Sequence, residues 1–236
     1  MKKAIKTLAL LLCAAAMMTS YSCHSNGNKL AQFEKKATEF KAALDPSNKV
    51  IAERIDTIAQ KVFYLEPNQE AEGVHPIHNI LVHDYATDKT QSLLPDEERI
   101  NEYLVWGQLI DDNDEEFNSF NHCFNLDYRS SELIGDRLFM MIHTECSYEM
   151  ETSLLFYVDI LDNSLHYVCT CDDVNYDKEK GTIDVHNDLM KFAGADLEYN
   201  YTLSASLSDK EYAAKRDEVE GICNQMSERW REENLD

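Results

Sequence analysis

The sequence predicts an α+β fold with a helical N-terminal segment, a central antiparallel β-meander that forms a curved sheet or an open barrel, and a C-terminal amphipathic helix. Three observations carry this prediction. Apolar residues recur at helical spacing early in the chain, apolar and polar residues alternate late in it, and a helix-capping sequence follows that alternation. The 236 residues suffice for one domain with an appendage.

The first predicted element is a helix whose apolar face repeats at steps of three and four residues: Leu30, Phe33, Ala37, Phe40 and Leu44. Asp45-Pro46 ends it, because proline lacks the N–H that a helix interior requires. A second stripe predicts a second helix that runs into a strand at 62–65; it consists of Ile51, Ile55, Ile58 and Val62. We therefore expect a helical segment over 29–61.

From residue 62 to 207 the pattern is typical of strands. Compact apolar runs occur at 80–82, 103–106 and 138–142, and period-two alternation occurs at 120–128 and 197–207. The segment 156–168 reads as a hairpin around an Asp162-Asn163 turn. One apolar and one polar face per strand indicates an antiparallel sheet.

The last predicted element is a helix after Ser208. Ser208 and Glu211 have the spacing of a capping box, in which each side chain bonds the other residue's backbone N–H. An apolar stripe follows that should pack on the sheet: Tyr212, Val219, Ile222, Cys223, Met226 and Trp230. Residues 62–236 are thus expected to form a sheet domain with a C-terminal helix.

The N-terminus has the pattern of a signal peptide over residues 1–22. Lys2, Lys3 and Lys6 form a basic start, and the uncharged apolar run 7–18 is too short to span a bilayer comfortably. This segment carries three lysines and no acid, so the rest of the chain has 19 basic and 44 acidic residues, a net charge of −25. That charge excludes nucleic-acid binding, which needs a basic surface, and disfavours adsorption to anionic lipid.

Ser20-Tyr21-Ser22-Cys23 resembles the lipobox of bacterial lipoproteins, although Ser20 stands where that family prefers an aliphatic residue. The resemblance implies cleavage before Cys23, fatty acylation of the Cys23 thiol and its new amine, and membrane attachment through the lipid alone. Residue 24 is not Asp, which favours the outer membrane. Residues 23–28 would form a polar tether. The alternative is ordinary signal cleavage after Ser22, which also follows a small-x-small pattern.

Five cysteines remain in the folded part: Cys123, Cys146, Cys169, Cys171 and Cys223. An odd number leaves at least one free thiol even in an oxidising compartment. Cys169 and Cys171 are two residues apart on a predicted strand, so their side chains share one face. We expect no disulfide between them.

Two patterns are compatible with a metal site. Asp173, Asn175, Asp177 and Asp184 occupy positions 1, 3, 5 and 12 of a calcium loop, but Lys178 replaces the required glycine. We expect an acidic hairpin turn there, with calcium binding as the alternative.

The second pattern is a histidine cluster, His75, His78 and His83 with Asp84. Spacings of three and five residues place neighbours on opposite faces of a strand, which disfavours zinc. The alternative is a loop that bends at Pro76 and brings the histidines together as metal ligands.

The sequence contains no Gly-x-Ser-x-Gly elbow, no His-Glu-x-x-His motif, no Walker loop and no dinucleotide-binding fingerprint. The sequence therefore predicts no cofactor, metal ligand or catalytic residue, and lipid attachment at Cys23 is its one site. The leading interpretation is an exported, lipid-anchored envelope protein that acts as a non-catalytic binding or structural module. The alternatives are an exported hydrolytic enzyme and a calcium- or metal-dependent binding module.

Overall fold

The computed structural model describes residues 29–67, 78–93, 125–145, 151–189 and 197–234. A helix over 29–43 is followed by eleven strands and a long helix within these ranges. The elements are β1 (Lys49–Ile55), β2 (Gln60–Pro67), β3 (His78–Asp84), β4 (Lys89–Ser92), β5 (Asn125–Ile134), β6 (Arg137–Glu145), β7 (Glu151–Asp159), β8 (Leu165–Cys171), β9 (Asp173–Asp177), β10 (Thr182–Leu189), β11 (Leu197–Ser204) and α4 (Asp209–Asn234).

The strands form three open antiparallel sheets. The first sheet has the order β1-β2-β3-β4, the middle sheet β5-β6-β7-β8, and the last sheet β11-β10-β9. The α+β prediction is therefore confirmed, with its antiparallel meander between an N-terminal and a C-terminal helix. The meander is divided among three sheets, where we expected one curved sheet or barrel. The apolar run 103–106 lies outside the described residues.

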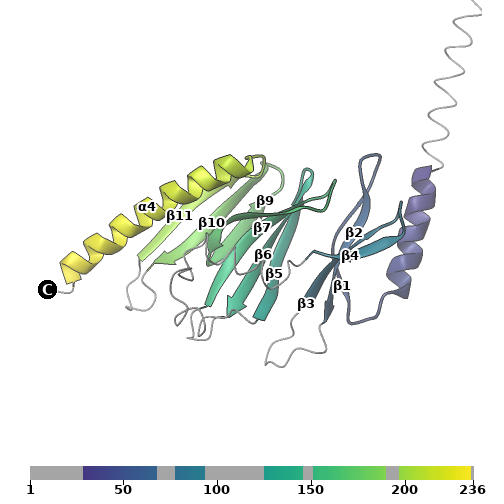
Figure 1. The fold of residues 1–236 in the computed structure, drawn as a ribbon, viewed down its shortest axis with the longest axis horizontal. Helices are drawn as coiled ribbons and strands as arrows, with labels where there is room; N and C mark the ends of the chain where they lie inside the picture. The colour runs from purple at the N-terminus through teal and green to yellow at the C-terminus, as the bar shows by residue number, and fades with distance from the viewer. Residues whose placement is uncertain (1–28, 68–77, 94–124, 146–150, 190–196, 235–236) are drawn as a thin grey trace, which may run out of the picture.

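The sheets stack face to face, with the middle sheet buried on both sides. Leu138, Met140 and Ile142 of β6 belong to the apolar cluster shared with the first sheet. The intervening Phe139 and Met141 belong to the cluster shared with the last sheet. An uninterrupted apolar run fits a strand without a solvent face. Figure 1 shows this arrangement, with the helix 29–43 at one end of the stack and α4 at the other.

The helix 29–43 covers the outer face of the first sheet. Its predicted apolar stripe packs there, with Phe33, Ala37, Phe40 and Leu44 against Val62, Tyr64 and Tyr85. The helix ends before Asp45, whose carboxylate accepts a hydrogen bond from the Ser47 N–H at 2.9 Å. The predicted break at Asp45-Pro46 is confirmed.

The segment 29–61 is helical only to residue 43. The prediction of a second helix in this segment is therefore wrong. Residues 49–55 form strand β1, which pairs with β2 from Lys49↔Leu65 to Ile55↔Gln60. The β-branched Val50, Ile51 and Ile55 lose rotamer freedom in a helix but fit a pleated sheet. Pairing with β2 therefore outweighs the helical spacing of the isoleucines.

Lys61 joins the first sheet to the middle sheet. This β2 side chain is only 6% exposed, and its Nζ donates hydrogen bonds to Ile160 O at 2.6 Å, Leu161 O at 3.1 Å and Asn163 Oδ1 at 2.8 Å. These acceptors belong to the predicted β7–β8 turn, where Asn163 has a positive φ of 64°. The turn prediction is confirmed, and a buried cation fixes the turn's position.

Helix α4 begins with the predicted capping box. The Ser208 N–H donates to Glu211 Oε2 at 2.8 Å, and the Glu211 N–H donates to Ser208 Oγ at 3.4 Å. Arg216 extends from the helix to the edge of the middle sheet, where its Nη1 donates to Val168 O at 2.8 Å and to Tyr167 O at 3.3 Å. These bonds provide donors for carbonyl groups of β8 that would otherwise lack a partner, because β8 is an edge strand.

Only the first half of the α4 stripe is deeply buried. Tyr212 and Val219 are 1% and 7% exposed, whereas Ile222, Met226 and Trp230 are half-buried. The predicted packing on the sheet is thus confirmed for the start of the helix and is weaker toward its end.

We expect Trp230→Ala to lower the free energy of unfolding by about 1 kcal/mol, well below the roughly 3–5 kcal/mol for a fully buried aromatic ring. Glu228→Ala, on the exposed face, should stay within about 0.5 kcal/mol of wild type. Urea titrations measure both. A loss of about 3 kcal/mol or more for Trp230→Ala would show that the end of α4 is fully packed.

Candidate functional site

At the centre of the outer face of the last sheet, all the side chains that point outward are polar. We call this area the polar face. It consists of Asp173, Asn175, Asp184, His186, Asn200 and Thr202. Alternation along each strand explains the arrangement, because the intervening Val174, Ile183, Val185 and Leu203 point into the core against the middle sheet. The alternation predicted for 197–207 is confirmed in β11.

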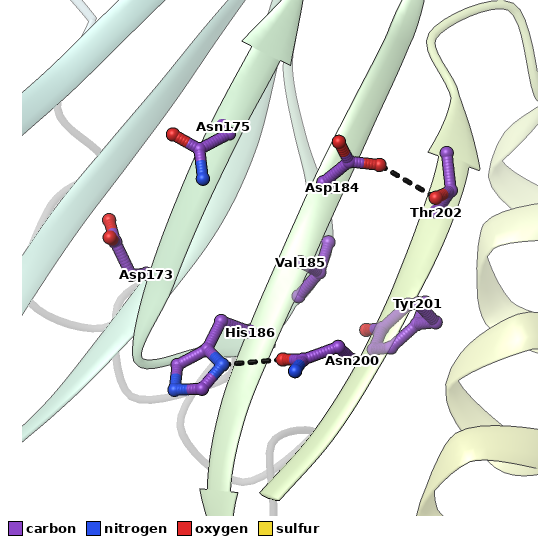
Figure 2. Close-up of a pocket in the computed structure, with 8 residues that line it drawn as sticks. All are labelled: Asp173, Asn175, Asp184, Val185, His186, Asn200, Tyr201 and Thr202. Carbon is purple, nitrogen blue, oxygen red and sulfur yellow. Dashed lines mark hydrogen bonds between the residues drawn. The ribbon is translucent and has the colours of Figure 1, made fainter.

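Strand register aligns these side chains in two rows across the sheet. In one row His186 is paired with Asp173 on one side and with Asn200 on the other. In the second row Asp184 is paired with Asn175 and with Thr202. Figure 2 shows both rows. Each row contains one carboxylate, one amide and one further polar group.

Hydrogen bonds between β10 and β11 hold part of the polar face in place. Thr202 Oγ1 donates to Asp184 Oδ1 at 2.6 Å, and His186 Nδ1 contacts Asn200 Oδ1 (Figure 2). The rows line a shallow, open pocket of about 400 Å³. Val185 and the half-buried Tyr201 also line the pocket. Because its exposed groups include two carboxylates, the pocket suits a cationic ligand better than an anion.

The twelve-residue acidic segment that contributes to this face is a β-hairpin, as the acidic-turn interpretation predicted. Asp173 and Asn175 lie on β9 and Asp184 on β10, so they share a sheet face and do not surround a loop. Asp177 is engaged elsewhere, because its carboxylate accepts the Lys180 Nζ at 2.6 Å and the Lys180 N–H at 3.0 Å. These bonds lower the pKa of Asp177. Four calcium ligands therefore do not converge here.

His83 and Asp84, the two members of the histidine cluster whose side chains the structure describes, have different partners. The His83 ring stacks on Phe40 at a centroid distance of 4.1 Å and its Nδ1 contacts Thr90 Oγ1 at 2.9 Å. The Asp84 carboxylate instead accepts the Ala86 N–H at 2.7 Å in the following turn. His75 and the side chain of His78 lie outside the described residues. Within the described ranges, no three His, Cys, Asp or Glu side chains converge to hold a metal ion.

Cys169 and Cys171 point to the same side of β8, as predicted, and both are 3% exposed in the core. The hydrogen bond between the two thiols and their burial raise the pKa of Cys171. These two residues and Cys223 are free thiols. Cys123 and Cys146 lie outside the described residues.

We expect native protein to react slowly with iodoacetamide at Cys169 and Cys171, because burial in the core keeps the reagent away from both thiols. The half-buried Cys223 should react earlier, and denaturation in urea should expose all three. Peptide mass mapping after timed alkylation measures this order. A Cys169–Cys171 disulfide in the native protein would contradict the strand geometry.

Three members of the polar face, Asp173, Asn175 and Asp184, stand out in the sequence because of their calcium-loop spacing. No such spacing marks His186, Asn200 and Thr202. The signal that could have found them is register, because pairing 173–177 with 182–186 around the turn aligns Asp173 with His186.

Cys23 lies outside the described residues, so its lipidation stays a prediction. None of the helices in the described part of the chain has the length and apolar content that crossing a bilayer requires.

Comparisons with known proteins give no family for this chain. No family model matches it, and no curated protein sequence matches it. One solved structure, "Crystal structure of the tricorn protease", aligns with 75% of this chain at 13% identity and a TM-score of 0.22. The alignment spans only 26% of the length of that protein. A likeness this low assigns neither a fold nor a function.

Proposed function

We propose that this chain is an exported, lipid-anchored protein of the cell envelope, and that its stacked-sheet domain binds a cationic ligand at the polar face. The observation that carries the binding role is the pair of polar rows that cross β9, β10 and β11 around a pocket of about 400 Å³. The lipid anchor, at the outer membrane, rests on the lipobox-like sequence ending at Cys23 and on the polar residues that follow it.

The charge of the molecule supports a cationic ligand. The whole chain has a formal net charge of −22, so its field attracts cations and repels anions. At the polar face, Asp173 and Asp184 can accept from an ammonium group, while the side chains of Asn175, Asn200 and Thr202 can complete its hydrogen bonds. Several such contacts are needed, because one exposed ion pair contributes at most about 1 kcal/mol.

Anchoring is tested with Cys23→Ala in full-length protein expressed in a Gram-negative host. Wild type should incorporate radiolabelled palmitate and sediment with membranes. The variant should lose the label and appear in the soluble fraction. An unlabelled wild type that fractionates as the variant does would contradict the lipid anchor.

Ligand binding is tested by calorimetric titration of the full chain with spermine, a polyamine, in about 0.15 M salt. Asp184→Asn should weaken binding by about fivefold, since it removes one exposed carboxylate, worth about 1 kcal/mol, from the centre of the polar face. Asp217→Asn makes the same change of charge on the exposed side of α4 and should leave affinity unaltered. Equal affinities in both variants, or no saturable binding by wild type, would contradict the proposed site.

A further inference from the structure

A serine, a histidine and an aspartate form a hydrogen-bonded chain where the β7–β8 turn meets the start of α4. Ser164 Oγ lies 2.7 Å from His166 Nε2, and His166 Nδ1 lies 2.8 Å from Asp209 Oδ2. Ser164 precedes β8 and His166 is its second residue, while Asp209 begins α4. The distances and the order of atoms are those of a nucleophile, a general base and the acid that orients the base.

The histidine ring is held in this orientation by neighbouring groups. Tyr157 stacks on it with a centroid distance of 4.5 Å and an interplanar angle of 4°. The Tyr157 hydroxyl donates to the other oxygen of Asp209, Oδ1, at 2.6 Å. The Arg137 guanidinium in turn lies 4.3 Å from the centre of the Tyr157 ring.

Asp209 is suited to remain ionised. Burial opposes its ionisation, but hydrogen bonds from Tyr157 and His166 outweigh burial and lower the pKa of its carboxyl group. Its position in the first turn of α4 adds the favourable field of the helix N-terminus. An ionised Asp209 stabilises the imidazolium that forms when His166 accepts a proton.

The Ser164 hydroxyl donates its hydrogen bond to Asp162 Oδ1 at 2.6 Å, and the same oxygen accepts the Ser164 N–H at 2.8 Å. The hydroxyl proton must therefore turn from Asp162 to His166 Nε2, which lies 2.7 Å from Oγ, before the histidine can accept it. Ser47 repeats this local geometry: its Oγ and N–H donate to Asp45 Oδ1 at 2.6 and 2.9 Å. No histidine bonds Ser47 within the described residues. Ser47 is therefore a matched control for Ser164. Both serines donate to a neighbouring aspartate, but in the described residues only Ser164 also contacts a histidine that is paired with a second aspartate.

We propose that Ser164 is a nucleophile for the hydrolysis of short-chain carboxylic esters, with His166 as its general base and Asp209 as the orienting acid. Oγ attacks the ester carbonyl carbon while its proton passes to His166 Nε2. The C–O bond to the alcohol then breaks, and the alcohol departs with that proton. Water, deprotonated by the same nitrogen, attacks the acyl-serine and releases the carboxylic acid, which restores Ser164.

The surroundings admit such a substrate. The side chain of His166 is 27% exposed, so part of its ring is accessible to an ester in solution. An open pocket of about 460 Å³ adjoins the same turn, lined in part by Asp159, Leu161 and Arg137. This activity goes beyond the proposed binding role, uses none of the residues of the polar face and is tested independently of it.

The first experiment is labelling of purified full-length protein with a fluorophosphonate probe, followed by peptide mapping. Ser164 should be labelled and Ser47 should not. His166→Gln should slow the labelling of Ser164 by about 100-fold or more, within the range for loss of a general base. Equal labelling of Ser164 and Ser47, or labelling unaffected by His166→Gln, would overturn the proposal.

The second experiment is turnover of p-nitrophenyl acetate. Ser164→Ala should reduce hydrolysis to the uncatalysed rate, while Ser47→Ala should retain the wild-type rate. Circular dichroism of each variant verifies folding, since His166 and Asp209 also connect β8 to α4. If folded Ser164→Ala hydrolyses the ester as fast as wild type does, the three residues only dock the helix and the proposal is wrong.

Discussion

Leu138→Ala is expected to lower the free energy of unfolding by about 2–5 kcal/mol and Phe139→Ala by about 3–5 kcal/mol. The two residues are adjacent on β6, and both are fully buried. Leu138 packs toward the first sheet and Phe139 toward the last sheet. Each truncation therefore leaves a cavity in a different interface of the middle sheet. Urea denaturation of the two single variants measures the losses.

An adjacent pair on β11 provides the control. Leu203 is 2% exposed and faces the core, whereas Thr202 lies on the polar face. Leu203→Ala should cost about 2–5 kcal/mol and Thr202→Ala about 1 kcal/mol or less. A similarly unequal pair of losses at Leu138 and Phe139 would mean that β6 has one solvent face, which contradicts the stacking.

Lys61→Met is expected to cost about 3 kcal/mol. Methionine fills a similar volume but donates no hydrogen bond, so Ile160 O, Leu161 O and Asn163 Oδ1 lose their bonds from the ammonium group. A buried acceptor without a donor costs roughly 1–3 kcal/mol. The nearby carboxylates of Asp84, Asp159 and Asp162 lose a positive neighbour as well.

Lys41→Met is the matched control for this substitution. Lys41 pairs with Glu53 at 2.7 Å on the surface, where an ion pair contributes at most about 1 kcal/mol. Chemical denaturation should separate the two variants by about 2 kcal/mol or more. Equal losses would show that the Lys61 ammonium is not an essential connection between the first and middle sheets.

Local patterns in the sequence predicted most elements of the fold. The capping box at Ser208, the alternation of 197–207 and the turn at Asp162-Asn163 each depend on neighbouring residues, so they can be read without tertiary information. The division into three stacked sheets depends on which distant faces meet. A local signal for it is the continuous apolar run 138–142, which fits a strand buried on both faces, although the sequence alone indicated only a strand there. Strand β1 was missed because pairing with β2 outweighed helical spacing.

The sites were harder to predict for the same reason. Asp173, Asn175 and Asp184 stood out by their spacing, but their neighbours on the polar face come from strand register. Ser164 and His166 form a short, unremarkable segment, and Asp209 lies 43 residues beyond His166. Only the docking of α4 against the β7–β8 hairpin brings the three together. A catalytic arrangement assembled from a turn and a distant helix leaves no motif in the sequence.

Attachment of this protein to the envelope through lipid can be decided from the mass of the N-terminal peptide of the mature protein, purified from membranes of a Gram-negative host. We predict that this peptide begins at Cys23 and carries the added mass of a diacylglyceryl group on sulfur, with or without an amide-linked fatty acid. A mature peptide that begins elsewhere, or one that contains an unmodified Cys23, would contradict the account.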